Sequence, residues 1–113
     1  MISIATVRKL ALAMDEVDEK PHFEKISFRI KNKIFSTVDV KANIIVLKLS
    51  EIDQSVFSDY DSSIIYPVPG AWGRQGWTMV EMKKVKRDLF KDALITAYCN
   101  VAPAKLSDKY RAE

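Results

Sequence analysis

The chain contains few of the residues on which small catalytic or cross-linked proteins depend. Its 113 residues include one cysteine, one histidine and three glycines. The single cysteine, Cys99, excludes an intramolecular disulfide and is typical of a reducing compartment. No apolar run approaches the ~20 residues that span a bilayer. Arg8 and Lys9 interrupt the apolar N-terminal stretch, unlike a signal peptide. We therefore expect a cytoplasmic protein that makes no contact with membranes.

The same scarcity argues against enzymatic chemistry. Cys99 and His22 would have to form any thiol–imidazole pair, but Cys99 lies in an apolar run typical of a buried helix. No serine occupies a G-x-S-x-G turn. One histidine and one cysteine do not make a zinc site, and a solvated helix end explains the acidic stretch 15–19 better than an iron site does. We predict no catalytic activity, no cofactor and no metal.

All three glycines lie three residues apart in residues 67–77, which also hold both tryptophans. A phosphate-binding loop needs a lysine after its last glycine and then a helix, whereas here Trp77 and a strand pattern follow. We interpret the segment as a long β-hairpin loop. Two alternatives remain for its tryptophans. They pack on the core, or Trp72 forms a contact surface with Arg74 and Gln75 for bases, phosphates or a protein partner.

Hydrophobic periodicity predicts a single α+β domain over residues 1–113. The predicted helices cover residues 4–14, about 51–57 and 85–100, and the predicted strands cover residues 26–31, 34–40, 44–49, 63–66 and 77–82. Ile52, Val56 and Phe57 are expected to face inward. Residues 15–20 and Pro21 are interpreted as a polar exit from the first helix. The prediction is a two-layer α/β fold of order α-β-β-β-α-β-β-α, with a mostly antiparallel five-stranded sheet and helices on one face.

Positive charge is concentrated in the predicted first strands. Residues 25–50 carry six Lys or Arg side chains and one acid, whereas residues 51–62 carry four acids and no base. The net charge of +3 does not by itself require a polyanionic partner. The expected central strand, residues 44–49, is apolar on both faces except for Lys48.

The most basic hairpin places Arg29, Lys31 and Lys33 around a turn at Asn32, a residue that tolerates positive φ. Lys25 precedes the same hairpin. Such a hairpin can act as a wing whose cations follow a phosphate backbone. Lysines on edge strands also prevent sheets from aggregating, and that role predicts the same exposed side chains. Exposure therefore does not distinguish a phosphate-binding wing from a protected sheet edge.

Several segments, in order along the chain, resemble the signatures of the MmcQ/YjbR-like family. The resembling segments are Pro21–Lys25, Phe28–Arg29, Lys33–Phe35, Pro69–Thr78 and Ala102–Leu106. Asn32 departs from the glycine that this family often has at the hairpin. The resemblance implies a two-layer α/β fold akin to the type III secretion chaperones and, more loosely, to the frataxin-like proteins. It also implies DNA binding through a double-wing arrangement.

Two functional hypotheses follow, and an enzyme ranks well behind both. The first is a small bacterial-type DNA-binding accessory protein. Its predicted contacts are Lys25, Arg29, Lys31, Lys33, Trp72, Arg74 and Gln75. His22 is expected near the tryptophan loop of residues 67–77. It is either a contact for the ligand or a buried, hydrogen-bonded side chain, and the second is the more common role of a lone histidine. The second hypothesis is a protein–protein adaptor or chaperone-like homodimer that uses an exposed sheet or the tryptophan loop.

Overall fold

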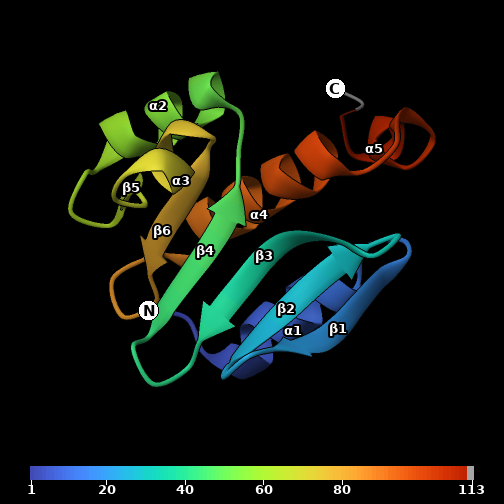
Figure 1. Cartoon of the computed structure of the whole chain (residues 1–113), viewed down its shortest axis with the longest axis horizontal. Coiled ribbons are helices and arrows are strands. Elements are labelled where there is room, and N and C mark those ends of the chain that lie inside the picture. The colour runs from blue at the N-terminus through green and yellow to red at the C-terminus, as the bar shows by residue number, and fades with distance from the viewer. Residues whose placement is uncertain (112–113) are drawn as a thin grey trace.

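Residues 1–111, the part of the chain that the computed structural model describes, form a six-stranded sheet with helices on one face (Figure 1). The strands are β1 (Val17–His22), β2 (Lys25–Ile30), β3 (Lys33–Asp39), β4 (Ile44–Lys48), β5 (Ile65–Pro67) and β6 (Trp77–Glu81). Their order across the sheet is β1-β2-β3-β4-β6-β5, and every neighbouring pair is antiparallel. The predicted fold class is confirmed.

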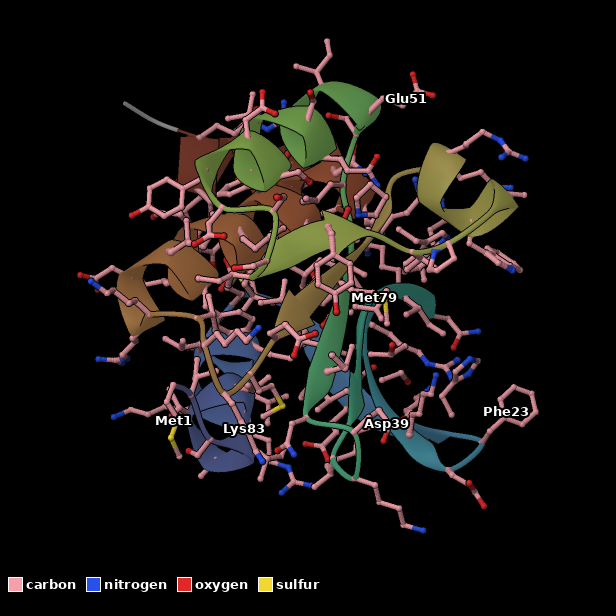
Figure 2. The ribbon with its side chains drawn as sticks, turned by 90° about the vertical axis from the view of Figure 1, so that its left-hand side faces the viewer. Met1, Phe23, Asp39, Glu51, Met79 and Lys83 are labelled. Carbon is pink, nitrogen blue, oxygen red and sulfur yellow. The ribbon has the colours of Figure 1, made fainter. Side chains whose placement is uncertain are left out.

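Helices α1, α2 and α4 cover one face of this sheet, and α5 packs on α4 (Figure 2). The helices are α1 (Ile4–Leu12), α2 (Glu51–Tyr60), α3 (Ala71–Arg74), α4 (Arg87–Val101) and α5 (Ala104–Arg111). The hydroxyls of Ser3 and Ser50 accept backbone N–H bonds at the starts of α1 and α2 and so cap both helices. The helix α3 is the exception to this arrangement, because it lies on the opposite side of the sheet (Figure 2).

The core lies between the sheet and the helices α1 and α4. Phe35 of β3 meets the ring of Tyr98 edge-on, with 5.8 Å between ring centroids, and both side chains are fully buried. The strand β4 lies between β3 and β6, as its two apolar faces predict. Its residues Ile45 and Leu47 point into the core, whereas Val46 is half-buried on the face that the large helices leave uncovered. That second face is where the candidate site is found.

The strand β1 was not predicted, so the sheet has six strands rather than five. The prediction that residues 15–20 and Pro21 form a helix exit is wrong, because Val17–His22 pair antiparallel with β2. β1 is an edge strand that bonds on one side, so it tolerates a proline and polar residues on both faces. Four of its six residues are exposed, which erases the alternating pattern that reveals an inner strand.

Two helices also differ from their predictions. Ile52 and Val56 were expected to face inward, but they are 77% and 62% exposed, while Phe57 is partly buried. Gln54 is the buried residue of α2, and the helix packs through this polar side chain together with Phe57. Residues 104–111, which lie outside the predicted helices, form the eight-residue helix α5.

Candidate functional site

The helix-free face of the sheet carries a groove with a volume of about 390 Å³, here called the sheet groove. Its lining residues are His22, Lys25, Ile34, Thr37, Val46, Val68, Trp72 and Trp77. Strands β3 and β4 supply the floor, the β1–β2 hairpin one wall, and α3 with the start of β6 the other. Figure 2 shows α3 and this hairpin projecting from the side of the sheet opposite α1, α2 and α4. The groove has an apolar floor and polar or aromatic walls.

The α3 wall depends on two glycines that allow the backbone to approach neighbouring strands. A Cβ atom on Gly73 would lie 1.9 Å from the carbonyl oxygen of Val68, and one on Gly76 would lie 1.8 Å from that of Leu49. Gly76 also has a φ of +101°, which glycine adopts most readily. The expectation of a hairpin loop without a helix is wrong here, because residues 71–74 form one helical turn, α3.

A buried glutamine anchors this wall to α2. The Nε2 atom of Gln54 lies 2.9 Å from the carbonyl oxygen of Gly73, 3.1 Å from that of Trp77 and 3.0 Å from Thr78 Oγ1. The Thr78 hydroxyl donates in turn to the carbonyl oxygen of Gly76 at 2.9 Å. This network fixes α3 against β6. Nothing in the sequence singled out Gln54, because a glutamine inside a helix is usually a solvated residue.

The two tryptophans have different environments. Trp77 is half-buried, and the ammonium of Lys48 lies 5.9 Å from the centroid of its ring while also donating to the carbonyl oxygen of Gln75. Trp72 is 62% exposed on α3. The first indole therefore supports the wall of the groove, and the second presents a large aromatic surface to solvent.

The opposite wall is the turn end of the β1–β2 hairpin. His22 and Lys25 face each other in the strand pairing and flank the two-residue turn of Phe23 and Glu24. The half-buried His22 ring meets the ring of Phe23 with 4.9 Å between centroids. The ammonium of Lys25 is exposed and forms no ion pair with any side chain of residues 1–111.

Arg29 lies on the same face of the sheet, beside the groove. It pairs with Ile34 of the groove floor in the β2–β3 register. Its Nε donates to Ser27 Oγ at 3.0 Å, and its Nη1 donates to Asn32 Oδ1 at 3.4 Å. These bonds hold the guanidinium along the strand, where its half-buried side chain borders the groove without lining it.

Lys31 and Lys33 are not brought to the groove, because they lie at the other end of β2 from Lys25. Lys31 and Asn32 form the β2–β3 turn with φ values of 48° and 68°, so the predicted turn at Asn32 is confirmed. The sequence predicted a strand that reaches Lys31, but Lys31 belongs to the turn and forms an ion pair with Glu16 at 3.3 Å.

Arg74 and Gln75 follow Trp72 at the end of α3, and both are exposed. Neither of them lines the groove. The structure therefore gathers His22, Lys25 and Trp72 around one hollow, with Arg29 beside it, whereas Arg74 and Gln75 are exposed residues outside its lining.

The acidic stretch that follows α1 is engaged in ion pairs. Asp15 pairs with Lys109 at 3.2 Å and Glu19 with Arg8 at 3.0 Å, in addition to the Glu16 pair. Within residues 1–111, no three His, Cys, Asp or Glu side chains gather in a way that would hold a metal ion. None of the helices in that part of the chain has the length and apolarity needed to cross a membrane.

No family model matches the chain, and no curated protein matches it in sequence. Among solved structures, the Deinococcus radiodurans protein DR2400, which carries the domain DUF419, is similar. The superposition covers 100% of this chain and 91% of that chain, with a TM-score of 0.80 and 15% sequence identity. At this identity the likeness shows the fold alone. The α+β architecture is therefore one that a known protein domain also adopts.

Proposed function

We propose that the chain is a DNA-binding protein of the MmcQ/YjbR-like type, without catalytic activity, and that it contacts DNA through the sheet groove. One observation carries this proposal. The exposed indole of Trp72 and the unpaired ammonium of Lys25 stand on opposite walls of one groove with an apolar floor.

Each component matches a part of a nucleotide. Aromatic faces stack on bases in a way that tolerates sequence changes, and the apolar floor excludes water from the contact. Lysine and arginine neutralise phosphates and release their counterions, which supplies much of the affinity. Arg29 beside the groove and Arg74, two residues after Trp72, add positive charge to the same region of the chain.

The position of each residue relative to the groove ranks the DNA contacts that the sequence predicts. Lys25 and Trp72 are central in this proposal, and His22 joins them as a wall residue. Arg29, Arg74 and Gln75 contact the ligand from outside the groove lining. Lys31 and Lys33 take part only with a ligand long enough to follow the β2–β3 hairpin to its turn.

Fluorescence polarisation with labelled oligonucleotides at several salt concentrations tests the proposal. We expect an affinity that falls steeply with salt, and a Lys25→Ala variant whose salt slope is smaller by about 0.7 to 0.9, as for one lost phosphate contact. The matched control is Lys91→Ala, which removes an exposed lysine from α4 on the opposite face. Equal affinities and slopes for the two variants would contradict a role for the groove.

A second candidate, a protein adaptor or homodimer, has support from α2. Ile52, Val56 and Tyr60 are 77%, 62% and 69% exposed and recur every four residues, so they form one apolar stripe on the helix. Stripes of this kind occur at protein interfaces. Sedimentation of the wild type and of Val56→Lys tests this candidate. A dimer that dissociates in the variant would favour it, and a monomer at high concentration would count against the homodimer.

A further inference from the structure

Phe23 occupies the tip of the β1–β2 hairpin in an unusual state. Its side chain is 93% exposed, and its φ is +59°. Figure 2 shows the labelled ring at the outermost point of the hairpin, pointing away from the rest of the molecule. Of the two turn residues, Phe23 has the positive φ and Glu24 does not. Glycine is favoured at such a first position of a two-residue hairpin turn.

Phenylalanine at this position is unfavourable for folding in two ways. Its Cβ atom strains a left-handed backbone, and its ring leaves a large apolar surface in water. The Phe23 ring meets the His22 ring edge-on, which is its one aromatic contact within residues 1–111. Because the Phe23 side chain is almost fully exposed, it gains little from packing. Strained residues that the fold does not require tend to occur where a protein binds or reacts. The state of Phe23 therefore points to a partner that covers the ring.

The ring stands beside the sheet groove. A second hollow, with a volume of about 660 Å³, is lined by His22, Phe23, Glu24, Lys25, Asp39, Lys41 and Ala42. The two hollows share His22 and Lys25, so they form neighbouring parts of one surface. Aromatic rings line this surface from Trp72 at one end, through His22, to Phe23 at the other.

The second hollow carries charges of both signs, because Lys25 and Lys41 are basic whereas Glu24 and Asp39 are acidic. Lys25 and Lys41 are exposed, whereas Asp39 accepts a hydrogen bond from the backbone N–H of Ala42 at 3.0 Å. Glu24 lies in the turn itself. Neither Lys25 nor Lys41 forms an ion pair with a side chain of residues 1–111, so both ammonium groups can reach a phosphate.

We infer that the nucleic acid bound here is single-stranded, with Phe23 and Trp72 as stacking residues at the two ends of the site. This inference rests on the function proposed above. In a duplex the faces of the bases are covered by their neighbours, and side chains reach only the base edges and the backbone. Two exposed rings, one on each of two neighbouring hollows, fit bases whose faces are free, as in unpaired strands.

The variant Phe23→Gly tests the inference, because it removes the ring and also suits the backbone of the turn. Its thermal midpoint should equal or exceed that of the wild type, so a loss of binding would not reflect unfolding. The probe is a labelled oligothymidylate of about 15 nucleotides, which matches the footprint of small single-strand binders. We expect about a tenfold or greater loss of affinity for this probe. Tyr60→Ala, which removes a 69% exposed ring from α2, should bind as the wild type does.

The outcomes separate this inference from the function on which it rests. Tighter binding of the wild type to a duplex of matched length than to oligothymidylate would overturn the inference and leave DNA binding in place. Wild-type affinity of Phe23→Gly for oligothymidylate would overturn it as well. If the wild type shows no salt-dependent binding to either probe, the proposed function fails and the inference fails with it.

Discussion

The side-chain amide of Gln54 lies 2.9 Å from the carbonyl oxygen of Gly73, and this contact ties the helical turn that carries Trp72 to α2. Replacing Gln54 with leucine would remove all three hydrogen bonds of this amide in a buried place, although the carbonyl oxygens of Gly73 and Trp77 would each keep a backbone N–H donor. We expect a loss of about 1–3 kcal/mol in the free energy of unfolding, measured by urea denaturation. Gln75→Leu, at an exposed position near the same turn, should change stability by less than about 0.5 kcal/mol. Equal midpoints for the two variants would show that the network does not anchor α3.

The glycines of this turn should differ in their tolerance to alanine. Gly73→Ala places a Cβ atom 1.9 Å from the carbonyl oxygen of Val68, so the backbone must move, and we expect a loss of more than about 2 kcal/mol. At Gly70 a Cβ atom meets nothing within 4 Å, and the cost of Gly70→Ala comes from its φ of +80°, at about 1 kcal/mol. Chemical denaturation of the two variants measures the difference, and the reverse order of stability would contradict the close approach.

Alkaline pH should weaken the fold through a tyrosine on the helix-free face. A hydrogen bond from the Tyr66 hydroxyl to Glu81, together with burial, raises the pKa of Tyr66 to about 12 from its ordinary value of 10.0. Because the raised pKa favours the protonated form in the folded state, this contribution to stability is complete below pH 10 and is lost as the pH rises towards 12. Tyr66→Phe should therefore lose less stability than the wild type between those pH values. Parallel pH profiles of the two proteins would argue against the bond.

The turn cations and the groove cation should contribute differently to DNA binding. Lys31 already pairs with Glu16 at 3.3 Å, and it lies at the far end of β2 from the groove. With a short oligonucleotide, Lys31→Ala should reduce affinity less than Lys25→Ala does. Competition binding under one salt condition measures this ratio. A larger effect at Lys31 would favour contact through the β2–β3 wing over contact through the groove.

Much of the fold could be predicted because its inner elements follow simple patterns. The apolar residues of β4 predict a central strand, and Ser3 and Ser50 mark the starts of two helices. The edge strand β1 could not be recognised in the same way. An edge strand needs one bonded side and no buried face, so its sequence resembles a polar loop.

The walls of the candidate site were only partly visible in the sequence. Trp72 and Lys25 stand out by residue type, but their convergence depends on the strand register and on the placement of α3. Gln54 lies 19 residues from Gly73 and shows no pattern that would identify it as the anchor of the wall. Ile52 and Val56 led to the opposite error, because they were predicted to be buried and are exposed. Helical spacing alone does not reveal which face of a helix is covered.

The most direct test of the account is a titration of intrinsic tryptophan fluorescence with oligonucleotide. If bases stack on the exposed indole, the wild type should show quenching that saturates with binding, and Trp72→Phe should lose most of that quenching and bind more weakly. The half-buried Trp77, which also lines the groove, remains in the variant, so circular dichroism rather than its fluorescence checks that the fold is unchanged. Quenching and affinity that are the same in the variant and the wild type would contradict the claim that the sheet groove binds nucleic acid.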